Sequence, residues 1–126
     1  MQQLKIQEYH GDDGQTVIFL AIIKKESIGR AEVLINDEQA FLKDISVTKI
    51  EPGRSWFPPF YTQGANYRGK GVGSALMAEV FAHCESLDVK EITGVMQGDI
   101  EFLSQWYQKH GFEVLEEQRI RHVFAA

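Results

Sequence analysis

The sequence is short of cysteine and of long apolar stretches. Its single cysteine, Cys84, excludes an intramolecular disulfide and a zinc site built from several thiolates, and it favours a reducing compartment. The longest apolar run, Val17 to Ile23, has seven residues, whereas a membrane-spanning helix needs about 20. No basic stretch followed by an apolar core opens the chain, so no secretory signal is expected. These features together predict a cytoplasmic protein without a membrane partner.

Positive charge is also scarce. The 126 residues carry 13 bases against 18 acids, which leaves a net charge of -5. Binding to a phosphate backbone needs a broad basic surface, so nucleic acid is not an expected partner. The hydrophobic share of 44% and the charged share of 25% are those of an ordinary globular protein. We therefore expect one domain over residues 1–126.

The first fifty residues have the patterns of β-strands. Polar and apolar residues alternate in 4–9, and β-branched residues fill Val17 to Ile23. Two more strands are expected over 28–35 and 40–50, separated by polar turns. No helix is expected here, so this half of the chain should form a β-meander.

The second half has two helical patterns. Apolar residues at spacings of three and four predict a first helix whose inner face holds Val72, Leu76, Met77, Val80, Phe81, Cys84 and Leu87. Asp88 should cap its exit before a strand over 91–96. A second helix should run from an N-cap at Asp99 to His110, with Gly111 as a left-handed C-cap. Its inner face should hold Ile100, Leu103, Trp106 or Tyr107, and His110. Strands after Phe112 and over 120–124 complete a mixed α/β (α+β) order with few helices.

Residues 52–64 separate the two halves and contain all three prolines together with several aromatics, without periodicity. This composition predicts a long, stiffened loop. Its aromatics either cover one end of the core or face a ligand. From 52 to 78 the chain has three bases, Arg54, Arg68 and Lys70, and no acid. Such a positive island favours a small ligand with several phosphates.

A glycine-rich turn, Arg68 to Ser74, leads into the first helix. The first N–H groups of a helix have no partner within it, and the helix dipole adds positive charge there. Glycine lets phosphate oxygens approach the backbone and permits the positive φ angles of a tight turn. This combination predicts an anion site.

Two nucleotide-binding patterns fit this turn poorly. A dinucleotide-binding fingerprint needs a third glycine where Ser74 stands, and it needs a preceding βαβ unit. A P-loop fits from Gly64 to Lys70, but Gly71 then replaces the Ser or Thr that holds magnesium.

A third pattern fits better. Arg68 to Gly73 matches the signature of arginine or glutamine, two residues, glycine, one residue, glycine or alanine that binds the pyrophosphate of coenzyme A. Tyr107 to Phe112 resembles the tyrosine, x, lysine, x, glycine, phenylalanine block of the same family. In this order, the two blocks make the chain resemble the GNAT superfamily of acyl-CoA-dependent N-acetyltransferases from Asn66 to about Glu117.

The resemblance implies a single GNAT-like domain with a central mixed, mostly antiparallel sheet and about two main helices. The two helices that usually follow the first strand of this family have no counterpart here, and residues 51–65 look inserted. Gly98 and Asp99 also stand where the family commonly has an asparagine. These departures concern the acceptor substrate more than the cofactor.

The resemblance further implies direct transfer of acetyl from acetyl-CoA to a primary amine, without a metal or a covalent enzyme intermediate. The pyrophosphate would bind to Arg68, Gly69, Lys70, Gly71, Val72, Gly73 and Ser74. A backbone N–H near Ser46 or Val47 would polarise the thioester carbonyl. Tyr107 would protonate the departing thiolate, unless it serves only as core packing.

The other candidate side chains are less clearly assigned. Glu51 is the candidate general base, with Asp44 as an alternative. Cys84 should be an inert buried thiol, and His110 a helix cap rather than a base.

The acceptor would be an amine on a small molecule or a peptide, and a homodimer stays open. A non-catalytic acyl-CoA-binding module of the same fold is the alternative function. The excess of acids mildly favours a cationic acceptor without selecting one.

Overall fold

The computed structural model describes residues 4–47 and 71–124. Its first part is the predicted β-meander, without a helix in 4–47. Consecutive strands pair antiparallel, and they are β1 (Lys5–His10), β2 (Thr16–Ile23), β3 (Glu26–Asn36) and β4 (Gln39–Val47). The expected continuation of the fourth strand over 48–50, and the loop that follows it, lie outside the described residues.

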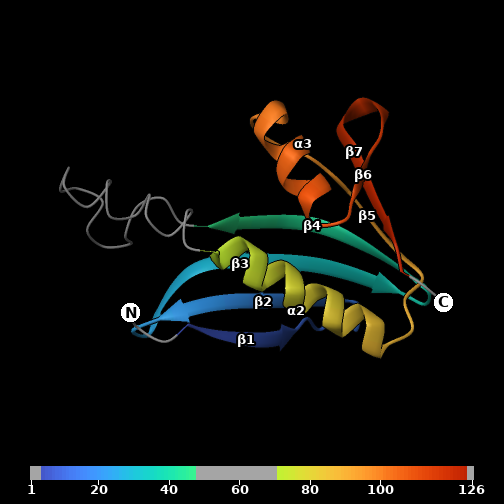
Figure 1. Cartoon of the computed structure of the whole chain (residues 1–126). Coiled ribbons are helices and arrows are strands. Elements are labelled where there is room, and N and C mark those ends of the chain that lie inside the picture. Colours follow the sequence, from blue (N-terminus) through green and yellow to red (C-terminus); the bar gives the residue numbers. More distant parts are fainter. Residues whose placement is uncertain (1–3, 48–70, 125–126) are drawn as a thin grey trace, which may run out of the picture.

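The second part alternates helices and strands. Its elements are α2 (Val72–Ser86), β5 (Glu91–Val95), α3 (Ile100–Lys109), β6 (Glu113–Val114), a 3-10 turn η1 (Glu116–Gln118) and β7 (Arg119–Val123). The strands form one seven-stranded sheet in the order β1-β2-β3-β4-β5-β7-β6 (Figure 1). Among the described strands only β4 and β5 pair in parallel. The expectation of a mixed, mostly antiparallel sheet with two main helices is therefore confirmed.

The helix ends follow the predicted caps. Asp99 accepts a hydrogen bond from the Phe102 N–H at the start of α3, and Gly111 has φ +94° after its end. At the end of α2, Asp88 takes φ +58° and the Val89 N–H donates to the Cys84 carbonyl at 3.0 Å. Local capping chemistry thus sets these boundaries.

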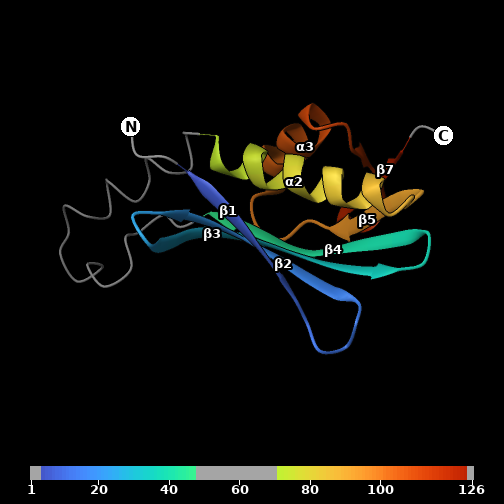
Figure 2. The same cartoon turned by 90° about the horizontal axis from the view of Figure 1, so that it is seen from below.

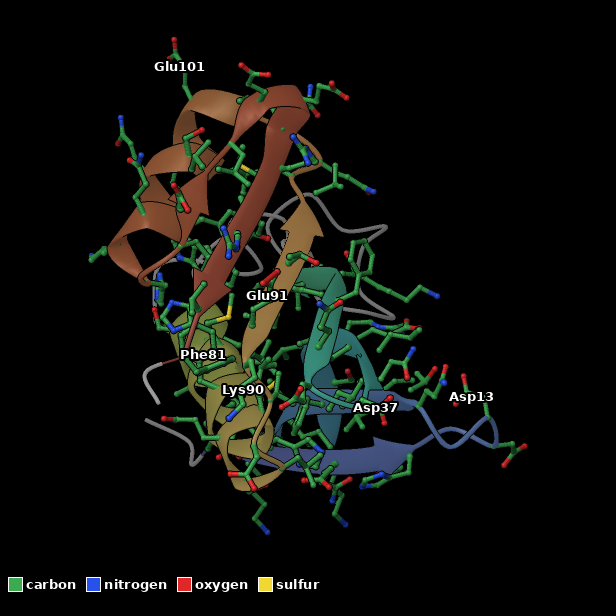
Figure 3. The ribbon with its side chains drawn as sticks, turned by 90° about the vertical axis from the view of Figure 1, so that its right-hand side faces the viewer. Asp13, Asp37, Phe81, Lys90, Glu91 and Glu101 are labelled. Atoms are coloured by element: carbon green, nitrogen blue, oxygen red, sulfur yellow. The ribbon has the colours of Figure 1, made fainter. Side chains whose placement is uncertain are left out.

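The core lies between α2 and the β2–β4 part of the sheet (Figure 2). The buried residues of α2 are Val72, Leu76, Met77, Val80 and Cys84, and they pack with Phe19, Ala31 and Val33 of the sheet. Phe81 lies where β7 passes α2, and its ring stacks on His122 at 4.6 Å (Figure 3). The prediction for Leu87 was wrong: this residue is 50% exposed because α2 ends at Ser86 and its periodicity ends there.

Candidate functional site

The sheet divides between its two parallel strands. β4 pairs with β5 only from Gln39 to Leu42, opposite Glu91 to Gly94, and then continues to Val47 (Figure 1). In the pairing with β3, Glu32 is opposite Asp44 and Val33 is opposite Leu42, so Lys43 is an extra residue in β4. Such a bulge bends its strand and strengthens the local twist. Among the described residues, β4 has no pairing with β5 beyond Leu42.

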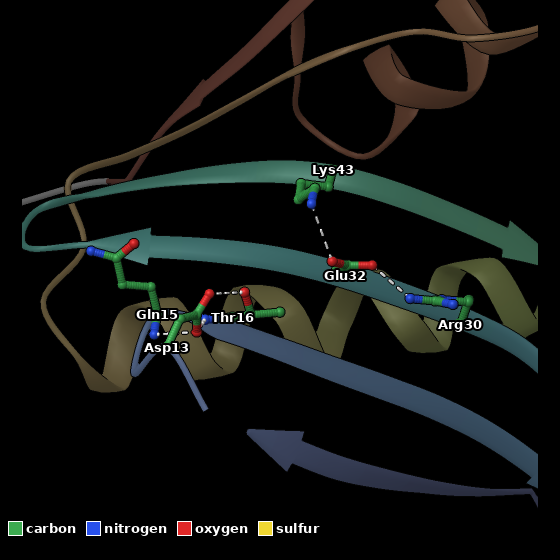
Figure 4. Close-up of polar contacts among 6 residues, drawn as sticks. All are labelled: Asp13, Gln15, Thr16, Arg30, Glu32 and Lys43. Carbon is green, nitrogen blue, oxygen red and sulfur yellow. Dashed lines mark hydrogen bonds and ion pairs between the residues drawn. The ribbon is translucent and has the colours of Figure 1, made fainter. Parts of the chain in front are cut away.

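Ion pairs hold the bulge in place. Lys43 Nζ lies 3.4 Å from one oxygen of Glu32, while Arg30 Nη2 lies 2.6 Å from the other (Figure 4). All three side chains stand on the sheet face opposite the buried Ala31 and Val33, since side chains alternate along β3. The Lys43 pair thus ties the extra residue of β4 to β3, next to the last β4 residue that pairs with β5.

Beyond the bulge, Ser46 and Val47 stand opposite Arg30 and Gly29 of β3. Successive N–H groups of a strand point to opposite sides. One of these two N–H groups therefore points toward β3, and the other points to the side on which β5 has diverged. This geometry is compatible with the predicted thioester contact, which itself stays a prediction.

α2 begins beside this end of β4. A Cβ on Gly29 would lie 3.1 Å from the Ser46 carbonyl oxygen and 3.3 Å from a methyl of Val72, so β3, β4 and α2 meet closely there. A Cβ at this position would crowd both atoms, so glycine favours the close approach. The first turn of α2 is consequently held against the diverging part of β4.

The N-terminus of α2 has the features of an anion site. Gly71 is its N-cap with φ +80°, and no side chain among the described residues caps it. The first helical bond runs from the Ala75 N–H to the Gly71 carbonyl at 2.9 Å, so Val72, Gly73 and Ser74 precede the helical ladder. Among the described residues, nothing lies within 4 Å of the place of a Cβ on Gly71. Since no side chain of the described residues caps these N–H groups, the turn is compatible with the predicted anion site.

Tyr107 approaches the same region from α3. Its side chain is 5% exposed and makes edge contacts with Trp106 and Phe112. Burial raises the pKa of Tyr107 to about 12, and the negative charge of Asp44 adds to this rise. Asp44 belongs to the part of β4 beyond its pairing with β5. Tyr107 thus stays protonated over the physiological range.

Contacts that sequence reasoning missed join α3 to α2. The ring of Trp106 packs over Gly73, where a Cβ would lie 3.1 Å from the ring. His110 Nε2 lies 2.8 Å from Ser74 Oγ, and His110 Nδ1 lies 2.8 Å from the Trp106 carbonyl oxygen. The predicted role of His110 as a cap is confirmed by this carbonyl contact. No local pattern could reveal its bond to a serine 36 positions away.

The remaining candidates divide into two groups. Cys84 is fully buried, and burial followed by the charge of Glu85 raises its thiol pKa to about 11, so the expected inert thiol is confirmed. Glu51, Arg68, Gly69 and Lys70 lie outside the described residues. Within residues 4–47 and 71–124, no group of His, Cys, Asp or Glu side chains could hold a metal ion. No helix in these ranges is long and apolar enough to cross a membrane.

Comparison with known families identifies the fold. A model described as "Acetyltransferase (GNAT) domain" matches residues 14–114. The chain belongs to the GNAT acetyltransferase family. The match includes the division between β4 and β5, the start of α2, and Tyr107. No curated protein is detectably similar in sequence.

Solved structures of low sequence identity have the same fold. A GNAT acetyltransferase from Elizabethkingia anophelis with acetyl-CoA bound superposes with a TM-score of 0.72 at 12% identity, covering 96% of this chain and 98% of that one. PaiA N-acetyltransferase from Thermoplasma acidophilum, in complex with coenzyme A, gives 0.69 at 16% identity and 89% coverage of this chain. The chain spans 63% of the length of that Thermoplasma protein. Arabidopsis thaliana Naa50, in complex with the bisubstrate analogue CoA-Ac-MVNAL, superposes with a TM-score of 0.61 at 20% identity. The match covers 85% of this chain and 72% of that one.

Proposed function

We propose that this GNAT domain transfers an acetyl group from acetyl-CoA to a primary amine of a small molecule or peptide. The observation that carries the proposal is that the part of β4 beyond its pairing with β5 adjoins the start of α2, which no side chain of the described residues caps. The helix that carries Tyr107 contacts the same turn through Trp106. The strand edge suits the amide arm of one acyl-CoA, and the anion site suits its pyrophosphate. The phenol suits its thioester. Structures of the same fold contain acetyl-CoA or coenzyme A, which supports the choice of cofactor.

The cofactor would bind through the backbone at two places. Its diphosphate would accept hydrogen bonds from the N–H groups of Val72, Gly73 and Ser74, as the positive end of the α2 dipole favours. Arg68, Gly69, Lys70 and Gly71 are proposed to complete this turn. The amides of the pantetheine arm would pair with β4 beyond Leu42, as an added strand pairs with a sheet edge.

The chemical step would be direct attack. The amine nitrogen forms a bond to the acetyl carbon while the C–S bond breaks and its electron pair moves to sulfur. A backbone N–H of Ser46 or Val47 would stabilise the charge on the acetyl oxygen. The proton of the amine passes to a base, for which we keep Glu51, with Asp44 as the alternative on β4.

Tyr107 would assist the leaving sulfur. Its pKa of about 12 lies above that of a free thiol, about 8.5, so complete transfer of its proton to sulfur is uphill. A protonated phenol can still donate a hydrogen bond to the developing thiolate. We therefore assign Tyr107 the role of a hydrogen-bond donor, with the proton on the released thiol supplied from the amine through solvent.

A thiol-release assay with acetyl-CoA and a panel of amines tests the proposal. We expect release of coenzyme A that depends on the amine and saturates with acetyl-CoA. Acetyl-CoA binding without turnover on any amine would instead favour the non-catalytic acyl-CoA-binding module. That alternative is supported by the direct connection of β1 to β2 through residues 11–15, which leaves no helix there to shape an acceptor site.

A further inference from the structure

His110 lies between the end of α3 and the beginning of α2, and its hydrogen bonds define where its proton resides. The Trp106 carbonyl can only accept, so Nδ1 at 2.8 Å must carry a proton. In the neutral ring, Nε2 then accepts a hydrogen bond from the Ser74 hydroxyl at 2.8 Å. In the charged ring, Nε2 donates to the same oxygen. The link therefore persists in both protonation states.

The end of α3 explains why this carbonyl is available. In a regular helix the His110 N–H would bond to the Trp106 carbonyl, but here it bonds to Tyr107 at 3.0 Å. Gly111 and Phe112 donate to Gln108 and Tyr107 at 3.0 Å, which is the Schellman pattern. The imidazole takes the place of the missing main-chain donor. The imidazole also lies 4.2 Å from the Trp106 ring, tilted by 35°, so the ring is restrained from two directions.

The beginning of α2 needs such a restraint. An N-cap side chain usually fixes the first turn of a helix, and Gly71 has none. A capping side chain would also occupy the N–H groups that an anion needs. Ser74 does not turn back to cap the helix, because its hydroxyl contacts His110. Trp106 over Gly73 adds a second contact from α3 to the same turn.

We propose that His110 is a positioning residue for cofactor binding. It holds Ser74, and with it the first turn of α2, at a set place relative to α3 while the backbone N–H groups stay available. This proposal rests on the proposed function, since the turn matters only if it binds the diphosphate of coenzyme A. His110 itself touches neither cofactor nor substrate in this role.

A double-mutant cycle on coenzyme A affinity, measured by calorimetry, tests this role. Ser74→Ala and His110→Ala should each weaken coenzyme A binding about 10-fold. The double variant should bind coenzyme A as tightly as the single variant with the lower affinity. Ser74→Thr keeps the hydroxyl and should bind coenzyme A more tightly than Ser74→Ala does. In turnover assays, the KM for acetyl-CoA should rise more than kcat falls. Ser86→Ala is the matched control, because its hydroxyl bonds to the His83 carbonyl at the far end of α2.

An NMR measurement on the ligand-free wild type tests the link without any variant. Long-range 1H–15N correlations should show the neutral His110 ring protonated on Nδ1, with Nε2 as acceptor. A ring protonated on Nε2, additive losses in the double variant, or equal affinities of the two alanine variants and the wild type would each overturn the positioning role alone. A wild type that binds no coenzyme A would overturn the proposed function together with it.

Discussion

α2 and β4 lie against each other, and their two ends differ. At one end α2 finishes in a Schellman pattern at Asp88 and Val89, and β4 begins paired with β5. The Lys90 N–H also donates to the Glu38 carbonyl at 2.6 Å, which ties the two elements together. At the other end α2 starts without a side-chain cap from the described residues, and β4 has left β5. The first end satisfies its own backbone, whereas at the second end the described residues supply no such partners, and there we propose that the cofactor binds. The difference teaches that one helix and one strand can have ends of different character, and we propose a structural role for one end and a binding role for the other.

The largest expected effect comes from a negative charge at the open end. Gly71→Glu should weaken coenzyme A binding at least 100-fold, because a carboxylate would repel the phosphates and the residue must adopt a positive φ. Calorimetry measures the affinity. Gly14→Glu is a matched control, since Gly14 has φ +75° and equally open surroundings in a distant turn. Equal losses in both variants would mean that backbone strain, not charge at a phosphate site, is responsible.

Removal of the phenol should affect turnover rather than binding. Tyr107→Phe should lower kcat by roughly 100-fold, as the loss of one donor to a transition-state charge does. The affinity for acetyl-CoA should change little, because the substitution removes only the phenol hydroxyl and keeps the ring that packs in the core. Tyr9→Phe changes an exposed tyrosine of β1 and should leave both quantities unchanged. If Tyr107→Phe turned over at the wild-type rate, Tyr107 would only pack the core.

The burial of Tyr107 should also appear in alkaline stability. A folded-state pKa of about 12 against an unfolded value near 10 means that stability is complete below pH 10 and is lost as the pH rises through 12. Between pH 9 and 11 this loss should be about 1 kcal/mol. The free energy of unfolding of the wild type and of Tyr107→Phe, measured with denaturant at both pH values, isolates the contribution of Tyr107. The buried Cys84 thiol contributes equally to the two proteins. Parallel pH profiles of the two proteins would contradict the buried phenol.

The smallest effect belongs to the closed end. Asp88 adopts φ +58°, where glycine is better tolerated, so Asp88→Gly should stabilise the fold by about 0.5–1 kcal/mol. Coenzyme A affinity should not change.

At the open end Gly71→Ala should destabilise the fold by about 1 kcal/mol, because it adds a Cβ at positive φ. Thermal unfolding of both variants checks the pair, and destabilisation by Asp88→Gly would show that the aspartate is needed there.

Much of the fold could be predicted because its signals are local. Alternation along the first strands, the cap at Asp99 and the left-handed Gly111 each depend on a few neighbouring residues. The glycine turn and the Tyr107 block were readable for the same reason. Leu87 was misplaced because a periodic pattern does not say where the helix ends.

The rest depends on contacts between distant segments. Lys43 looks like any polar strand residue, and only its partners on β3 show that it is the extra residue of a bulge. The meeting of Ser74 with His110 likewise requires that α2 and α3 first pack on their sheet.

The amino-acid sequence by itself therefore determined the described elements, their caps and the start of α2 at Gly71, since propensity, periodicity and capping act over a few residues. Only the tertiary structure decided the separation of β4 from β5, the approach of Tyr107 to Asp44 and the support of α2 by His110. These features arise from register and packing between segments far apart in the chain, and no local pattern contains that information.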